Sequence, residues 1–132
     1  MVMGGGNPPG LEGTLFAAPT LFADVTPDMR LAREEVFGPV LAVMRFSTEE
    51  EAIAIANDTP YGLTNYVQSQ DGAKRNRVAR RLRSGMVEMN GQSRGAGSAF
   101  GGVKMSGRAR EGGVMGLEEF MDSKAISGWA TD

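Results

Sequence analysis

The fold is decided by residues 40–50, which read Val-Leu-Ala-Val-Met-Arg-Phe-Ser-Thr-Glu-Glu. The unbroken apolar run Val40–Met44 is typical of a strand that is buried on both faces. Ser47 followed three residues later by Glu50 has the form of a capping box, and apolar residues then recur at the spacing of a helical face. We therefore predict a buried strand followed directly by a helix that ends before Pro60.

The alternation of strand and helix extends along the chain. Strands are predicted on either side of Pro19 and at residues 63–69, 86–89 and 124–129, and further helices at residues 71–83 and 110–121. Asp71 is placed to cap the first of these helices. Because strands alternate with helices, βαβ crossovers are favoured, and the expected fold class is α/β, a mainly parallel sheet with flanking helices. Residues 1–13 form a Gly/Pro-rich lead-in, and residues 14–132 are expected to form a single α/β domain.

Composition excludes several classes of chemistry. The chain has 132 residues, with 14 Lys and Arg against 16 Asp and Glu, and it contains no Cys and no His. A disulfide, a thiolate nucleophile and a Cys-ligated metal are therefore excluded, and the usual general base is missing. Carboxylate, Lys, Ser or Tyr chemistry stays open, as does binding without chemistry. We expect no metal site, and a chain of this length should bury roughly two thirds of its unfolded surface.

The sequence also restricts the partners of the chain. A net charge of −2 provides no global attraction to nucleic acid or to an anionic membrane. No apolar run approaches the roughly 18 residues that span a bilayer, and the first residues do not form a signal peptide. We expect no membrane partner, no nucleic-acid partner and a cytoplasmic location.

Two phosphate-binding motifs fail when they are tested against the Gly-rich stretch from residue 91 to residue 107. Gly95-Ala96-Gly97 begins like G-x-G-x-x-G, but Phe100 occupies the third glycine position. The run from Gly97 to Lys104 approximates a P-loop, but Val103 separates the glycine from the lysine. The sequence therefore offers no phosphate cradle.

Two clusters of charged residues are considered as possible binding sites. Six cations between Lys74 and Arg83 could contact nucleic acid, but they lack aromatic stacking partners, and a solvated helix face is the simpler interpretation. Among the carboxylate pairs, Glu34-Glu35 differs because it lies just before Phe37-Gly38-Pro39, at the mouth of the predicted buried strand. Its location makes it a candidate site.

Four ordered blocks carry a resemblance to a known family. They are residues 33–40 (REEVFGPV), 57–63 (NDTPYGL), 85–90 (GMVEMN) and 100–107 (FGGVKMSG), followed by Arg110-Glu111 and Gly116-Leu117. In order and spacing they resemble the aldehyde dehydrogenase superfamily. The resemblance implies that this chain corresponds only to the C-terminal part of the catalytic domain, about the last third of a family member.

The resemblance implies roles for individual residues. Glu35 looks like the carboxylate that binds the nicotinamide ribose hydroxyls, and Phe37 looks like the aromatic beside the nicotinamide ring. Asn90 and Phe100 flank what resembles the loop that walls the aldehyde tunnel, which makes Arg94 a candidate for substrate contact, together with Gln92 and Ser93. Each role has an alternative. Phe37 could pack in the core, Glu35 could be surface charge, and Arg94 could be an exposed side chain that contacts nothing. Ala99 departs from the family, which commonly has Pro there.

The resemblance also implies a reaction that this chain does not complete. Family members oxidise aldehydes to acids with NAD or NADP, through a Cys nucleophile, a Glu base and a cofactor domain that lie upstream of the matching part. The isolated chain is therefore expected to hold no catalytic residue, to be inactive and to bind no cofactor tightly. The aldehyde is expected as substrate only in the complete enzyme, which is expected to be a homo-oligomer. The alternative is a stand-alone, non-catalytic, self-associating remnant of the same fold.

Overall fold

The structure is a computed structural model, and it describes residues 1–130. Contacts between Cα atoms divide the chain into two compact units. The first contains residues 1–60 and 80–82, and the second contains residues 61–79 and the chain from residue 83 onward. The expectation of a single domain over residues 14–132 stays a prediction, and each unit is described by itself below.

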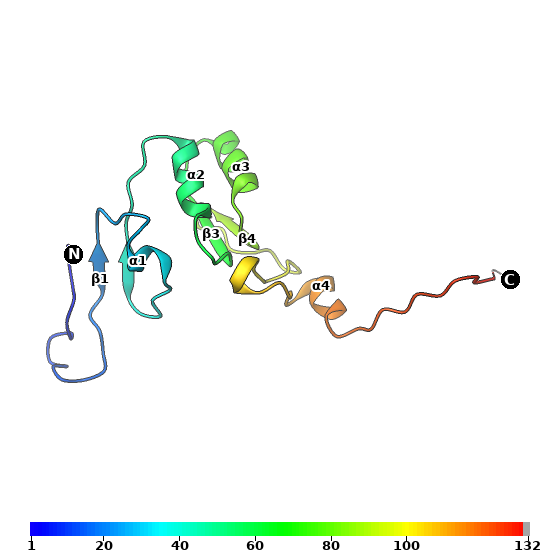
Figure 1. Ribbon diagram of the computed structural model, residues 1–132, viewed down its shortest axis with the longest axis horizontal. Helices are drawn as coiled ribbons and strands as arrows, with labels where there is room; N and C mark the ends of the chain where they lie inside the picture. Colours follow the sequence, from blue (N-terminus) through cyan, green and yellow to red (C-terminus); the bar gives the residue numbers. More distant parts are fainter. Residues whose placement is uncertain (131–132) are drawn as a thin grey trace. The chain divides into compact units, whose positions relative to one another are not determined.

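The first unit contains one parallel strand pair and two helices. Its elements are β1 (Thr20–Phe22), α1 (Arg30–Arg33), β2 (Val40–Ala42) and α2 (Glu49–Asn57). β1 and β2 lie side by side (Figure 1), with Thr20 opposite Val40 and Phe22 opposite Ala42. Only one strand forms near Pro19, because the residues before it are tied instead to the lead-in, where the Asn7 amide donates to the carbonyls of Thr14 and Phe16.

β2 is more exposed than its apolar sequence predicts. Leu41 is 62% exposed and Val43 is 40% exposed, so the strand is not buried on both faces. The reason is that β2 has only β1 as a hydrogen-bonded neighbour strand, in a sheet of two strands. A run of this kind normally lies in a wider parallel sheet that is covered on both sides.

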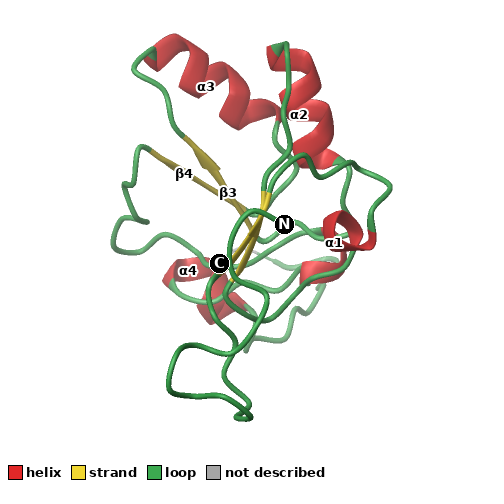
Figure 2. Ribbon diagram, turned by 90° about the vertical axis from the view of Figure 1, so that its left-hand side faces the viewer, coloured by secondary structure: helices red, strands yellow, loops and turns green. Residues whose placement is uncertain are grey.

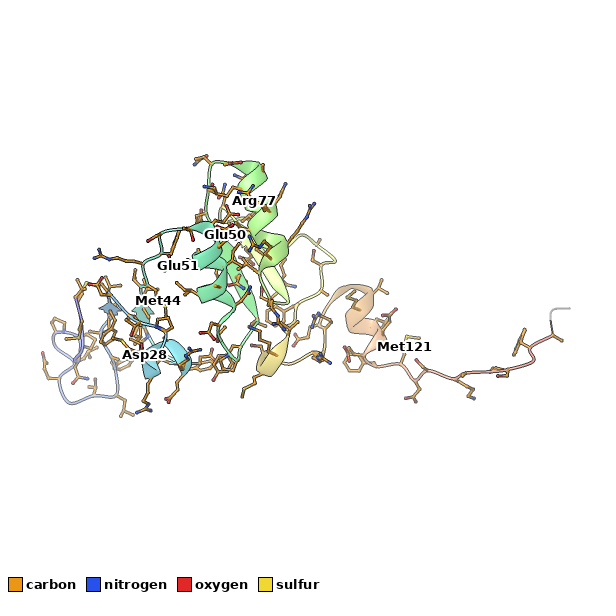
Figure 3. All side chains as sticks on the ribbon, turned by 45° about the horizontal axis from the view of Figure 1, so that its top comes forward. Asp28, Met44, Glu50, Glu51, Arg77 and Met121 are labelled. Atoms are coloured by element: carbon orange, nitrogen blue, oxygen red, sulfur yellow. The ribbon has the colours of Figure 1, made fainter. Side chains whose placement is uncertain are left out.

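α2 begins one residue later than the capping box at Ser47 predicts. The Thr48 hydroxyl accepts from the Glu51 backbone N–H at 3.1 Å, and the Glu51 carboxylate accepts from the Ser47 N–H at 2.7 Å. Thr48 is therefore the N-cap, with extended backbone angles of −129° and 160°. The residues Thr48-x-x-Glu51 fit the same motif as Ser47-x-x-Glu50. Figure 3 labels Glu50 and Glu51 in the first turn of this helix.

The second unit contains the other parallel strand pair. Its elements are β3 (Thr64–Val67), most of α3 (Gly72–Arg81), β4 (Met86–Met89), the 3₁₀ helix η1 (Lys104–Ser106) and α4 (Gly113–Glu118). β3 and β4 run parallel from Thr64 opposite Met86 to Val67 opposite Met89. Asp71 caps α3 as predicted, because its carboxylate accepts from the Lys74 N–H at 3.1 Å.

Three expectations for the sheet and the C-terminal part are wrong. The described residues form two separate two-stranded parallel sheets, not one mainly parallel sheet, and most of the chain is loop (Figure 2). α4 is shorter than predicted, because Gly112 and Gly113 both have positive φ and delay its start. Residues 124–129 form no strand, because no neighbouring strand of the described chain pairs with them. The α/β class itself, with parallel strands and helices, is confirmed.

The core is small for a chain of this length. Within residues 1–130, Val25 and Ile53 are the buried hydrophobic side chains, at 6% and 5% exposure. The chain exposes 10208 Å², whereas an unfolded chain of 14.0 kDa exposes roughly 20,300 Å². About half of the surface is buried, less than the predicted two thirds. No helix within the described residues is long and apolar enough to cross a membrane.

Candidate functional site

The Glu35 loop joins α1 to β2 in the first unit. The Arg30 guanidinium donates to both Glu34 oxygens at 2.9 and 2.8 Å, and these hydrogen bonds hold the pKa of the Glu34 carboxyl below its usual value. Arg33 donates to the Asp58 carboxylate at 2.8 Å. Within the described chain, the Glu35 carboxylate has no hydrogen bond and no ion pair. Of the two adjacent carboxylates, Glu35 is therefore the one whose oxygens are available to a ligand.

Phe37 lies two residues beyond Glu35 and is 96% exposed. A tight turn follows it, in which Gly38 N–H donates to the Val36 carbonyl at 2.9 Å and Val40 N–H donates to the Gly38 carbonyl at 2.8 Å. The Pro39 carbonyl accepts from Thr20 N–H at 2.8 Å, which anchors the turn to β1. The ring is therefore held outside the core of its own unit, and core packing within the described chain does not explain it.

Asn90 lies directly after β4 in the second unit. Its side-chain amide donates to the Ser69 carbonyl and its amide oxygen accepts from the Ser69 N–H, both at 3.0 Å. Its φ is 52°, in the left-handed region that Asn tolerates better than most residues. Both polar atoms of the side chain are thus used to join the ends of β3 and β4.

Arg94 and Phe100 are brought together in the loop after β4. The Arg94 guanidinium carbon lies 5.0 Å from the centre of the Phe100 ring, within the range of a cation–π contact. The same guanidinium donates to the Ser98 carbonyl at 3.1 Å. The alternative of an Arg94 that contacts nothing is therefore wrong, because this side chain closes its own loop.

Phe100 is fixed by backbone pairing with Glu111. The two residues exchange N–H···O hydrogen bonds of 2.7 Å in an antiparallel bridge. Arg110 reinforces the turn by donating to the carbonyls of Gly102 and Arg108 at 2.7 Å. This contact is not predictable from the sequence, because a single Arg carries no signal of which carbonyls it will bind.

A hollow of about 520 Å³ lies in the second unit, beside the start of the loop that follows β4. It is lined by Arg75, Asn76, Val87, Met89, Asn90 and Gln92. Asn90 and Gln92 are among the predicted substrate-side residues. Its lining residues carry three amides and one guanidinium beside the apolar side chains of Val87 and Met89.

The structure thus places the candidates in two groups. Glu35 and Phe37 share one loop of the first unit, and Asn90, Arg94 and Phe100 lie along one segment of the second. No group of three or more potential metal ligands occurs within residues 1–130.

Known structures share this backbone over nearly its whole length. An aldehyde dehydrogenase from Bartonella henselae is 60% identical with a TM-score of 0.90, and the match covers 96% of this chain and 27% of that one. A mutant of aldehyde dehydrogenase C from Pseudomonas syringae, in complex with NAD⁺ and octanal, is 47% identical with a TM-score of 0.91, covering 98% and 27%. The fold is therefore that of one part of an aldehyde dehydrogenase structure.

The family assignment follows from sequence comparison. The profile of the aldehyde dehydrogenase family matches residues 1–126. A 3-succinoylsemialdehyde-pyridine dehydrogenase from a Pseudomonas species is 48% identical over 130 residues, which are 98% of this chain and 27% of that protein. The chain belongs to the aldehyde dehydrogenase family, and it spans about a quarter of the length of these relatives.

Proposed function

We propose that the chain is the C-terminal part of the catalytic domain of an NAD(P)-dependent aldehyde dehydrogenase, which oxidises an aldehyde to a carboxylic acid. The observation that carries the proposal is the loop after α1, where Glu35 has no partner in the described chain and Phe37 is 96% exposed. These two side chains are free to meet a ligand, while the neighbouring Glu34 is tied to Arg30.

The donor and acceptor chemistry of the loop fits a nicotinamide cofactor. A carboxylate accepts hydrogen bonds from two hydroxyls at once, so Glu35 is suited to a ribose diol. An aromatic ring at Phe37 restricts where a nicotinamide ring can lie. When bound, the cofactor supplies the acceptor for hydride, while the roles of Glu35 and Phe37 are to bind and orient it. The Pseudomonas syringae relative binds NAD⁺, which supports NAD as one of the two candidate cofactors.

The loop from residue 90 to residue 100 supplies the proposed substrate wall. We assign Asn90 to positioning, because both its polar atoms bind Ser69. The guanidinium carbon of Arg94 lies 5.0 Å from the centre of the Phe100 ring, and this contact closes the loop between them. The loop therefore presents a surface that includes both a positive charge and an aromatic ring. The aldehyde is the expected partner only in the complete enzyme.

The isolated chain is proposed to be inactive. It contains no Cys, and the thiolate nucleophile of the reaction must therefore come from polypeptide outside these 132 residues. We also propose a cytoplasmic location and a homo-oligomeric complete enzyme, without nucleic-acid or membrane partners.

A self-associating remnant without catalytic activity is the second candidate. The exposed apolar side chains favour it, since Leu41 and Phe37 are 62% and 96% exposed. Large exposed apolar patches usually mark interaction sites.

A chimeric enzyme tests the proposed function. In the Bartonella henselae enzyme, the segment that matches this chain is replaced by residues 1–132, and aldehyde-dependent NADH or NADPH formation is measured. We expect turnover from the chimera and none from the isolated chain. An inactive chimera that folds and binds NAD⁺ would favour the non-catalytic remnant, and turnover by the isolated chain would contradict the proposed inactivity.

A further inference from the structure

Arg94 is the charged residue of the loop that follows β4. Residues 91–99 contain no other acidic or basic side chain, so Arg94 gives this loop a positive charge. Other arginines, such as Arg30 and Arg33, form ion pairs with carboxylates. Within the described chain, Arg94 has no ion pair. Its charge is therefore available to an anionic ligand.

The guanidinium of Arg94 is held in place by two contacts inside the second unit. Its carbon lies 5.0 Å from the centre of the Phe100 ring, and its Nη1 donates to the Ser98 carbonyl at 3.1 Å. Phe100 is itself fixed by the two backbone hydrogen bonds that it exchanges with Glu111. Because the guanidinium is already oriented, it loses less side-chain entropy when it binds a ligand than a freely moving cation would.

These two contacts leave one edge of the guanidinium open. The Nε and Nη2 atoms of Arg94 donate to no group of the described chain. Arg30 shows what the same two nitrogens do beside a carboxylate, since its Nε and Nη2 donate to the two Glu34 oxygens at 2.9 and 2.8 Å. The open edge of Arg94 is therefore suited to bind a carboxylate through two parallel hydrogen bonds.

We propose that Arg94 determines substrate specificity, and that its Nε–Nη2 edge selects aldehydes that carry a carboxylate at the end remote from the aldehyde group. This inference rests on the proposed function, which assigns the loop from residue 90 to residue 100 to the substrate wall. The fold by itself does not impose an anionic substrate, because the Pseudomonas syringae mutant is in complex with octanal, an uncharged aldehyde. The preference for a carboxylate comes from Arg94.

A phosphate group fits this edge less well than a carboxylate does. Proteins commonly hold phosphate through several backbone N–H groups together. In this loop the Gln92 N–H already donates to the Met89 carbonyl and the Ser98 N–H to the Gly95 carbonyl, at 3.1 Å each. The guanidinium edge instead offers two donors in one plane, which match the two oxygens of a carboxylate.

Substrate competition in the chimeric enzyme tests this role. The measured quantity is the ratio of kcat/KM for succinic semialdehyde to kcat/KM for butanal, which has the same number of carbons and no carboxylate. We expect Arg94→Gln to lower this ratio at least about tenfold, because two hydrogen bonds to a charged group are lost. Arg94→Lys, which keeps the charge but not the planar edge, should give an intermediate ratio. Arg108→Gln, which removes the same charge at an exposed position of the same unit, should leave the ratio unchanged.

The outcomes separate this inference from the proposed function. An active chimera in which Arg94→Gln lowers kcat/KM equally for both aldehydes, or for neither, would overturn the specificity role and leave the function intact. If the folded chimera is inactive, calorimetry measures its affinity for succinate and for butyrate instead. Succinate should then bind at least about tenfold more tightly than butyrate, and Arg94→Gln should remove the difference. Equal affinities for the two acids would overturn the specificity role as well.

Discussion

Gly85 shows at the residue scale why this chain carries so many glycines. A Cβ atom built at Gly85 would lie 1.9 Å from the Gly101 carbonyl oxygen and 2.8 Å from the Gly102 Cα. The backbone before β4 and the Gly-rich turn after Phe100 therefore pass each other with no room for a side chain. This close approach belongs to the same turn that Arg110 holds through the Gly102 carbonyl.

Gly85→Ala is expected to destabilise the second unit by about 1–3 kcal/mol or more, because the methyl group must displace backbone. Gly6→Ala is the control, since nothing lies within 4 Å of a Cβ atom there and its φ is not positive. Urea unfolding followed by circular dichroism measures both. Equal unfolding midpoints for the two variants would contradict the close approach.

Residue identity alone allowed some of the site to be predicted and not the rest. Glu35 was singled out from its place beside Phe37-Gly38-Pro39, but the ion pair that occupies Glu34 and leaves Glu35 free depends on where α1 ends. The contact between Arg94 and Phe100 was not predicted either, because it depends on how residues 94–100 fold back on themselves.

At the scale of elements, local signals predicted the starts of α2 and α3 closely, but they did not predict α1 and placed the start of α4 too early. The cap of α3 by Asp71 was predicted correctly, and the cap of α2 was predicted one residue early because Ser47 and Thr48 fit the same motif. Strands were less predictable, since residues 124–129 have strand-like composition but no partner within the described chain. Strand formation depends on pairing with distant residues, and a local pattern does not contain that information.

Thr48→Ala is expected to destabilise α2 by about 1 kcal/mol, because the Glu51 N–H loses its acceptor. Ser47→Ala should have little effect, since Ser47 contributes its backbone N–H to the capping box. Urea unfolding followed by the helix signal in circular dichroism distinguishes the two variants by their unfolding midpoints. A larger loss of unfolding free energy from Ser47→Ala than from Thr48→Ala would show that Ser47 is the N-cap.

Asp71 gives α3 a dependence on pH. Hydrogen bonding from the Lys74 backbone N–H lowers the pKa of Asp71 below its ordinary value. The charged form is thus favoured in the folded state, so its stabilising effect is present above the ordinary pKa and is lost as pH falls through the lowered pKa. We expect the wild-type chain to lose helix signal across this acid range more steeply than Asp71→Asn, whose amide oxygen still accepts but does not titrate. Parallel acid titration curves would contradict the cap.

At the scale of the whole molecule, the small core is the dominant property. Only about half of the unfolded surface is buried, and the exposed side chains include Phe37, Leu41 and Phe120. Because the urea m-value scales with the surface exposed on unfolding, we expect a clearly lower m-value for this chain than for a compact monomeric domain of equal length. An m-value typical of such a domain would show that the isolated chain buries more surface than the structure indicates.

The most direct test of the central claim, that this chain supplies the cofactor-binding wall of an aldehyde dehydrogenase, is the KM for NAD⁺ of the chimera in three forms. Glu35→Gln should raise this KM about tenfold relative to the unchanged chimera, because a neutral amide replaces the carboxylate that accepts from the ribose hydroxyls. Glu34→Gln should leave it unchanged, since the Glu34 carboxylate is bound to Arg30. Equal KM values for all three forms, or a rise confined to Glu34→Gln, would contradict the account.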